Sequence, residues 1–397
     1  MRADSRHGLA FVVQRYGAEV TGGSESLARA LAERLSAEAP VTVFTTCARD
    51  YVTWRNELPA ATETSGPLTV RRFPVAEERD LESFNRFSES LYDRPHTDED
   101  ERLWLRRQGP YVPELVRALA AEHERFRAVL FFTYLYYPAC EGLRAASARS
   151  ILVPTAHDEP PLRFRLYDEV FALPRAFAFL SPAEEELVRR RFSLGGRPAV
   201  LAGMGVDDGK EPDVAAFRRC HGIAGRYLAY AGRIDAGKGC AEMLALFERF
   251  RRETATPVDL LLMGRLAMSL PDTPGVRYLG YLSEEDKRAA LAGADVVLCP
   301  SPYESLSIVL LEAFSLGVPG LVNARSAVLV DHCRRANAGL YYACADEFGG
   351  ALGLLLGDAS LRRTLGENGR RYVREHHRWD VVLESYRRLI AAVSGES

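Results

Sequence analysis

The feature that most constrains the fold is a steady alternation of short apolar runs with longer amphipathic stretches. In the first half we predict strands at 9–16, 41–46, 68–75, 128–134, 149–156, 176–181 and 199–203. In the second half we predict strands at 226–232, 258–263, 276–280, 294–299, 319–323 and 339–342. Strands that alternate with helices form parallel sheets covered on both faces. The chain is therefore predicted to be α/β, with two doubly wound domains.

The domain boundary is predicted in the polar, glycine-containing connection at 204–212. The chain has 397 residues, which suits two domains of ~100–200 residues each. We predict a first domain over 1–205, a second over 206–376 and a terminal helix over 377–397. The helix carries an apolar stripe on one face, so we expect it to pack back on the first domain.

Charge and cysteine usage exclude several classes of protein. The formal net charge is −3 and arginines are interspersed with acids, so no nucleic-acid partner is expected. The seven cysteines show no CxxC pair and no metal-ligand spacing. This usage is typical of the reducing cytoplasm. The apolar run at 9–13 is too short for a signal peptide or a membrane span. We expect a cytoplasmic protein, and peripheral contact with the inner membrane face stays open.

The first candidate site is the segment 300–317, a loop and helix after the buried strand predicted at 294–299. Doubly wound sheets bind ligands at the carboxyl ends of their strands, and a helix start favours anions such as phosphate. Glu312 lies within an otherwise apolar helix, where a carboxylate is costly unless it is hydrogen-bonded. A ribose diol would supply donors to Glu312, and a sugar hydroxyl would do so for Glu304. The alternative is two acids that simply reach solvent.

A second candidate loop, 231–239, also follows a predicted strand. Gly232 lets backbone approach a ligand closely. Arg233 and Lys238 would clamp a diphosphate, the first as a planar fork and the second as a point charge. The alternative is an ordinary turn with surface cations. The pair Gly22 and Gly23 precedes a helix and would admit a phosphate, although a plain turn explains it as well.

His157 ends the apolar run at 149–156, where its ring would donate to a hydroxyl or carbonyl of a sugar. A structural histidine fits this position equally. Asp98 and Asp100 have the DxD spacing that holds Mn²⁺ or Mg²⁺, but they lie in a charge run without a strand, so no metal is expected. The chain lacks GxSxG, Walker A and an early GxGxxG, which argues against hydrolases, P-loop ATPases and ordinary NAD enzymes.

Taken in order, these motifs resemble the family-4 retaining glycosyltransferases of the GT-B fold over nearly the whole chain. The matching features are Gly22, Gly23, His157, the loop 232–239, the Glu-x7-Glu pair Glu304 and Glu312, and the helix from Trp379. The resemblance implies two Rossmann-like domains that face a central cleft. It also implies a nucleoside-diphosphate sugar bound mostly by the C-terminal domain.

The resemblance implies a role for each motif. Arg233 and Lys238 would bind the diphosphate, Glu312 the ribose and Glu304 the hexose hydroxyls. Backbone N–H groups would meet phosphate and sugar at Ser305, Leu306, Ser307 and Ile308. Gly22 and Gly23 would complete the diphosphate site on closure, with His157 near the reacting carbon. The nucleobase is expected to lie between two loops, one with Gly264 and Arg265 and the other with Tyr281 and Leu282.

The implied reaction retains anomeric configuration by same-face substitution and needs no metal or other cofactor. Its catalytic residues would be His157, Arg233, Lys238 and Glu304. The acceptor would be a hydroxyl of a sugar, a lipid-linked molecule or a small molecule, near the aromatic, charge-rich segment 80–110. A sugar-nucleotide epimerase, a sugar-phosphate synthase and a non-catalytic nucleotide-sugar-binding protein are the alternatives.

Four positions depart from the usual family pattern. Ser305 and Ser307 stand where glycine is frequent, so their side chains narrow the sugar pocket. Met204 stands where asparagine often precedes the domain junction, and Arg265 replaces a commoner small residue. We expect the selectivity for sugar and base to depend on these differences.

Overall fold

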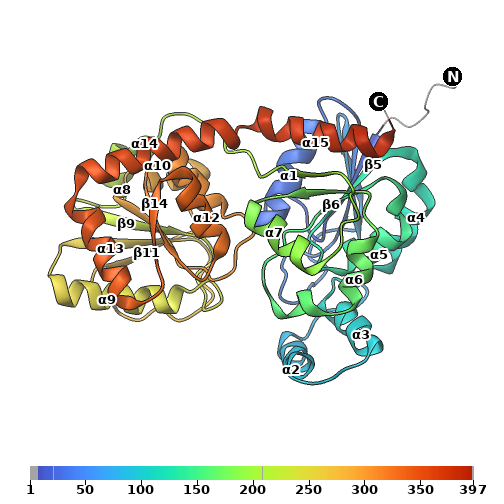
Figure 1. Ribbon diagram of the computed structural model, residues 1–397, viewed down its shortest axis with the longest axis horizontal. Helices are drawn as coiled ribbons and strands as arrows, with labels where there is room; N and C mark the ends of the chain where they lie inside the picture. The colour runs from blue at the N-terminus through green and yellow to red at the C-terminus, as the bar shows by residue number, and fades with distance from the viewer. Residues whose placement is uncertain (1–7, 21, 208, 396–397) are drawn as a thin grey trace. The chain divides into compact units, whose positions relative to one another are not determined.

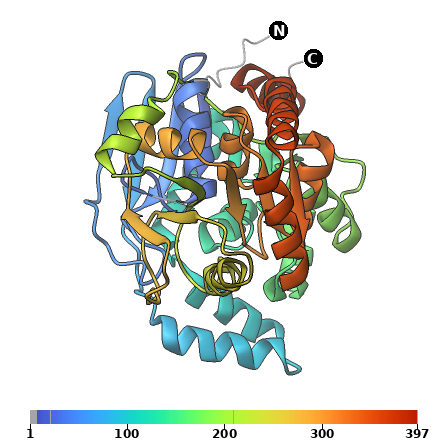
Figure 2. The same ribbon diagram turned by 90° about the vertical axis from the view of Figure 1, so that its left-hand side faces the viewer.

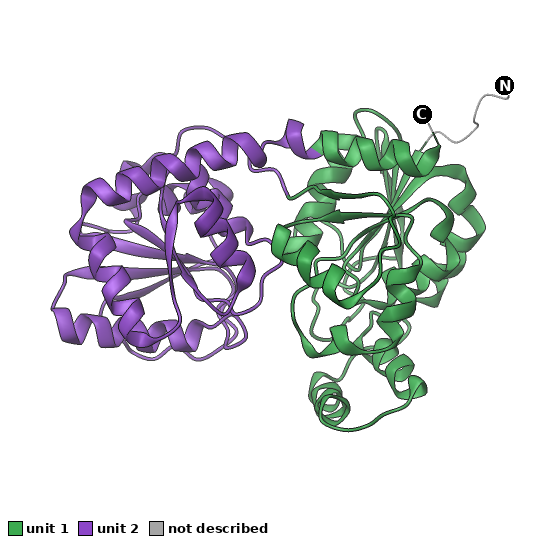
Figure 3. Cartoon of the chain, viewed as in Figure 1, with its two compact units in different colours: residues 1–203, 383–397 green, residues 204–382 purple. Residues whose placement is uncertain are grey.

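A computed structural model describes residues 8–20, 22–207 and 209–395. The chain divides into two compact units (Figure 3). Unit 1 comprises 1–203 and 383–397, and unit 2 comprises 204–382. Each unit is built around its own sheet with helices on both faces (Figure 1).

Unit 1 contains an eight-stranded sheet in the order β3-β4-β2-β1-β5-β6-β7-β8. Its strands are β1 Gly8–Val12, β2 Val41–Thr46, β3 Thr62–Ser65, β4 Leu68–Phe73, β5 Phe126–Phe132, β6 Ser150–Val153, β7 Ala176–Phe179 and β8 Ala199–Leu201. All neighbours pair in parallel except β3, which is antiparallel to β4. The sequence reading missed β3 because its four residues are exposed and give no apolar signal.

The helices of unit 1 are α1 Gly23–Leu35, α2 Leu81–Tyr92, α3 Asp98–Gln108, α4 Pro113–Glu122, α5 Tyr137–Ala145, α6 Leu166–Ala172 and α7 Pro182–Arg191. Leu27, Leu31 and Leu35 of α1 are buried, as their spacing along the helix predicts. The buried core between sheet and helices is rich in phenylalanine and leucine.

The segment 80–110 forms α2 and α3, which lie together at one end of unit 1 (Figures 1 and 2). The Trp104 ring is buried and meets Phe164 edge-on at 5.2 Å between ring centroids. The buried Glu101 carboxylate accepts hydrogen bonds from the backbone N–H groups of Arg165 and Leu166. These contacts fix α3 to the loop that precedes α6.

Unit 2 contains a six-stranded parallel sheet in the order β11-β10-β9-β12-β13-β14. Its strands are β9 Arg226–Ala231, β10 Val258–Met263, β11 Val276–Gly280, β12 Val296–Cys299, β13 Gly320–Asn323 and β14 Gly339–Tyr342. Its helices are α8 Val214–Cys220, α9 Cys240–Thr254, α10 Glu284–Ala292, α11 Ile308–Ser315, α12 Ala327–Ala336, α13 Ala345–Gly357 and α14 Ala359–His376. Each strand expected here is present.

The last helix, α15 Trp379–Ser394, begins in unit 2 and ends in unit 1. Just before this helix, the backbone N–H of Val206 donates a hydrogen bond to the His377 carbonyl at 2.8 Å. The Trp379 ring packs closely on Gly205, since a Cβ there would lie 2.3 Å from the ring. Within unit 1, the Arg387 guanidinium pairs with Glu38 at 2.7 Å. No helix among the described residues is long and apolar enough to cross a membrane.

Candidate functional site

The two loops singled out in the second half of the sequence meet in unit 2. One follows β9 and the other follows β12, and these strands are neighbours in the sheet. The carboxyl ends of parallel neighbours share one edge, so the loops lie side by side there. The Lys238 ammonium contacts the Glu304 carboxylate at 2.7 Å between Nζ and Oε1. The structure therefore brings together Lys238, which is predicted to bind phosphate, and Glu304, which is predicted to bind the sugar.

Glycines allow the loops of this edge to approach one another closely. A Cβ on Gly239 would lie 2.4 Å from the backbone oxygen of Pro300. A Cβ on Gly264 would lie 2.0 Å from the backbone oxygen of Gly232, and φ of Gly264 is 131°. The loop after β10, expected beside the base, is thus packed on the diphosphate loop. A hydrogen bond of 2.9 Å from the Ile234 N–H to the Arg265 carbonyl ties the same loops together.

Asp235 organises the diphosphate loop and was missed in the sequence reading. Its carboxylate accepts from the Lys238 backbone N–H at 2.7 Å and forms an ion pair with the Arg233 side chain. The Tyr230 hydroxyl donates to the Arg233 carbonyl at 2.6 Å. An aspartate three residues before the lysine of a turn is a signal for such a bond. Asp235 thus pairs with the Arg233 side chain and fixes the backbone of Lys238 before a ligand arrives.

Glu312 has a partner that the sequence reading also missed. The Lys287 ammonium, on α10, lies 2.9 Å from Glu312 Oε1 and 2.7 Å from a Glu284 oxygen. Among the residues that the structure describes, nothing donates to the buried Oε2 atom of Glu312. Burial raises the pKa of the Glu312 carboxyl, and the Lys287 ammonium opposes that rise. A buried oxygen with unused acceptor capacity is what a ribose hydroxyl would require.

The loop between β12 and α11 differs in one respect from expectation. The helix was expected to start near Ser305, but α11 begins at Ile308. Ser307 is its N-cap and has φ 67° and ψ 78°, a left-handed conformation that costs ~1–3 kcal/mol in a residue other than glycine. The loop before it is held by Asn323, whose amide donates to the Pro300 carbonyl at 3.0 Å. The Asn323 bond fixes the start of this loop at Pro300.

Tyr281 and Leu282 follow β11 at the same edge of the sheet. The Tyr281 side chain is 70% exposed, so its ring is accessible to a ligand. The Gly264 N–H donates to the Gly280 carbonyl at 2.8 Å, and the Tyr278 hydroxyl donates to the Gly264 carbonyl at 3.0 Å. Both sides of the predicted base pocket are therefore linked by hydrogen bonds.

The remaining predicted site residues lie in unit 1. Gly22 and Gly23 stand at the start of α1, where a Cβ on Gly22 would lie 2.2 Å from Glu25 Oε2. The Glu25 carboxylate is buried and accepts from the side chains of Gln14 and Arg15 at 2.9 Å. His157 follows β6, and its Nδ1 atom lies 3.4 Å from Glu159 Oε1.

The acids with DxD spacing have structural roles in α3. Asp100 forms a capping box with Thr97, and Asp98 pairs with Arg165 at 2.7 Å. Within the described ranges, no three His, Cys, Asp or Glu side chains are grouped so as to hold a metal ion.

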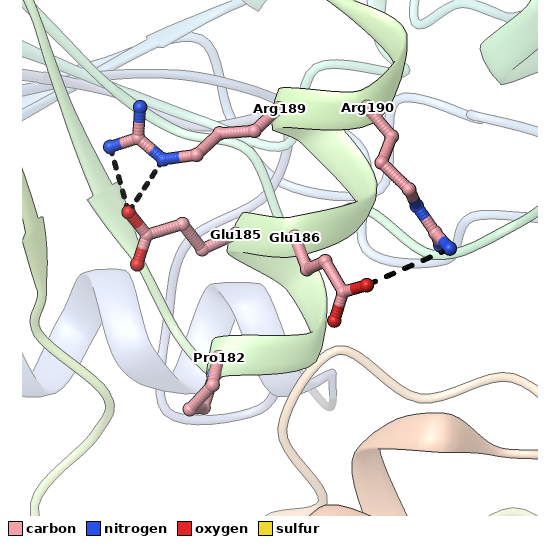
Figure 4. A pocket seen from close by; sticks show the side chains of 5 residues that line it. All are labelled: Pro182, Glu185, Glu186, Arg189 and Arg190. Atoms are coloured by element: carbon pink, nitrogen blue, oxygen red, sulfur yellow. Dashed lines mark hydrogen bonds and ion pairs between the residues drawn. The ribbon is translucent and has the colours of Figure 1, made fainter.

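A shallow surface depression on α7 lies elsewhere in unit 1 and is lined by Pro182 and four charged side chains. Figure 4 shows these side chains paired along the helix, Glu185 with Arg189 and Glu186 with Arg190. Glu184 of the same helix is instead buried, with 1% of its surface exposed. The Glu184 carboxylate accepts hydrogen bonds from backbone N–H groups instead of from water.

Comparison with known proteins bears on the unit that carries this edge. Residues 218–372 match the family of glycosyl transferases group 1. The chain is 31% identical over 191 residues to the MMP alpha-(1->4)-mannosyltransferase of Mycolicibacterium hassiacum, a match that covers 43% of this chain and 45% of that protein. The chain thus spans less than half the length of this curated relative.

Solved structures resemble the chain over nearly its whole length. Sucrose-phosphate synthase from Thermosynechococcus elongatus superposes with a TM-score of 0.73 at 21% identity, covering 98% of this chain and 100% of that one. Anabaena HepE, solved with UDP and glucose, superposes with a TM-score of 0.67 at 14% identity and the same coverage. At these identities the likeness concerns the fold. The expected α/β class with two Rossmann-like parallel-sheet units, shared with GT-B glycosyltransferases, is confirmed.

Proposed function

We propose that the protein is a retaining glycosyltransferase that moves a hexose-type sugar from a nucleoside-diphosphate sugar to a hydroxyl acceptor without a metal. The observation that carries this proposal is the shared edge in unit 2, where Lys238 contacts Glu304 and where no described residue donates to the buried Oε2 atom of Glu312. The match of 218–372 to glycosyl transferases group 1 supports it, because that range contains all three residues.

The donor would lie along this edge with its diphosphate at Arg233 and Lys238. Negative charge grows on the diphosphate as the bond to the sugar breaks, and cations already in place stabilise that charge. Asp235 and Glu304 already hold Arg233 and Lys238 when no nucleotide-sugar is bound, so the loop needs little rearrangement when the nucleotide-sugar binds. The leaving diphosphate would take the proton of the acceptor hydroxyl, and no protein nucleophile would be required.

The two acids would have separate tasks. Glu312 would accept from the ribose, because its free oxygen lies in the helix beyond the phosphate loop. Glu304 would accept from a hexose hydroxyl while it keeps the contact with Lys238, so that sugar and phosphate are positioned by one ion pair. The serines at 305 and 307 would then select among hexoses, since their side chains occupy space that glycine would leave open.

Product stereochemistry tests this proposal. The protein would be incubated with α-linked glucose and mannose donors on UDP, GDP, ADP and dTDP, a panel of sugar and lipid-linked acceptors, and excess EDTA. We expect an α-configured product in the anomeric region of the ¹H NMR spectrum. A β-configured product would contradict retention. Conversion of the donor sugar without an acceptor would indicate an epimerase, and nucleotide binding without turnover would indicate a non-catalytic protein.

A further inference from the structure

Two carboxylates that the proposed mechanism does not use support the loop after β6. Glu184, 1% exposed, accepts from the backbone N–H groups of Ala156 at 2.7 Å and Leu180 at 2.6 Å. Thr155, the residue before Ala156, has φ 52°, and its hydroxyl contacts the Thr133 hydroxyl at 3.0 Å. Left-handed backbone in residues other than glycine persists only where surrounding contacts over-determine it. The backbone that leads into His157 is therefore held rigidly.

The second carboxylate, Glu159, faces the ring of His157. Its Oε1 atom lies 3.4 Å from His157 Nδ1, and the Glu159 N–H donates to the His157 carbonyl at 2.8 Å. The fully buried Tyr134 donates its hydroxyl to the same Oε1 atom at 2.9 Å. Histidine and glutamate thus form one tight turn that the phenol ties to the end of β5.

This arrangement favours one position for the ring proton of His157. Because Tyr134 donates to Oε1, that oxygen acts as an acceptor toward its surroundings. Burial raises the pKa of the Glu159 carboxyl, and the His157 imidazole and the Tyr134 hydroxyl oppose that rise. An acceptor opposite Nδ1 favours the proton on Nδ1 and leaves the lone pair on Nε2. The 3.4 Å contact lacks hydrogen-bond geometry in this structure, so the ring must turn before Nδ1–H can donate to Oε1. Catalytic hydrogen bonds often tighten in this way when substrate binds.

We propose that Glu159 is a positioning residue that holds His157 as the Nδ1–H tautomer, so that Nε2 accepts a hydrogen bond from a hydroxyl of the transferred sugar. The proposal rests on the proposed function and refines it, because His157 then accepts from the sugar rather than donating to it. It also explains why the mostly buried Glu159 carboxylate lies beside a phenol, since among the described residues it pairs with neither arginine nor lysine.

The tautomer of His157 can be measured in the full chain without knowledge of the donor. The protein would be labelled with ¹⁵N-histidine, and the two ring nitrogens of His157 would be recorded at about pH 8.5, where an ordinary imidazole is neutral. The test variant is Tyr134→Phe/Glu159→Leu, because removing both partners avoids an unpaired buried hydroxyl. Glu159→Gln keeps an oxygen acceptor. Asp158→Asn is the matched control, since Asp158 is 67% exposed and pairs with Arg163.

We expect Nδ1–H in the wild type, in Glu159→Gln and in Asp158→Asn, and a shift toward Nε2–H in the double variant. Turnover with the donor found in the product assay should fall roughly 10–100-fold in kcat with little change in KM, by analogy with the loss of a partner that orients a metal-bound histidine. The loss should vanish in a His157→Ala background, because the two sites act as one unit.

An unchanged tautomer in the double variant, or additive losses with His157→Ala, would overturn the role of Glu159. Wild-type turnover of His157→Ala alone would instead remove His157 from the sugar site. That outcome counts against the proposed function, and the tautomer measurement separates it from a failure of the Glu159 contact.

Discussion

Replacing Glu312 by glutamine should weaken donor binding while the protein stays folded. The side chain is 15% exposed, and its Oε2 atom is unused among the described residues, so a ribose hydroxyl there would form a charge-assisted hydrogen bond. Losing such a bond costs about 1.5–3 kcal/mol, or about 10–150-fold in Kd. Lys287 keeps the Glu284 carboxylate at 2.7 Å. Lys287 therefore keeps one charged partner in the variant, although that partner is 75% exposed and pairs only weakly. We expect the free energy of unfolding to fall by about 1–2 kcal/mol, less than for a buried lysine left with no partner.

Calorimetric titration with a nucleoside diphosphate and with its hexose conjugate is the assay. Because the ribose belongs to both ligands, Glu312→Gln should weaken both by the same factor. Glu304→Gln should weaken only the conjugate. Glu284→Gln is the matched control, since it removes a charge from the same lysine on its exposed side. Wild-type Kd values for both ligands in Glu312→Gln would refute the assignment.

Three further outcomes are expected. Gly264→Ala should destabilise unit 2 by about 1–3 kcal/mol in urea unfolding, because the new Cβ would lie 2.0 Å from the Gly232 carbonyl oxygen. Gly349→Ala is the control, since a Cβ there meets open space. Equal stabilities of the two variants would refute the close packing at Gly264. Burial lowers the pKa of His332 to about 3 and of His377 to about 4. As pH falls, the unfolded chain binds protons at these histidines before the folded chain does. The free energy of unfolding should therefore fall below about pH 6.5, by up to about 1.4 kcal/mol per pH unit for each histidine. His332→Gln should make this dependence on pH less steep in urea unfolding. Transfer activity should survive excess EDTA, and an absolute Mn²⁺ requirement would contradict the metal-independent mechanism.

The sheets could be predicted from the sequence because apolar runs record burial directly. Every predicted strand is present, whereas the exposed edge strand β3 leaves no such record. Element boundaries were less accurate: α11 begins three residues later than expected because Ser307 adopts a left-handed conformation that no propensity favours.

The partners of the site residues could not be predicted in the same way. Glu312 was singled out because it interrupts an apolar helix, but Lys287 lies on another helix and meets it only through tertiary packing. Glu159 and Glu184 stand among charged residues in the sequence, and only the fold shows that Glu184 is buried and that the Glu159 side chain is no more than 18% exposed. His377 lies in a polar stretch of sequence, yet it is 5% exposed. Sequence patterns report single elements, while these pairings depend on how elements meet.

The most direct test of the central claim is a thermal-shift screen of UDP, GDP, ADP, dTDP and their hexose conjugates against the wild type, Lys238→Ala and Glu312→Gln. A ligand present at 100 times its Kd stabilises the folded state by about 2.7 kcal/mol. We predict that at least one nucleotide series raises the wild-type Tm by several degrees and that both variants lose most of that shift. No shift with any nucleotide, or a full shift in both variants, would contradict the donor site described above.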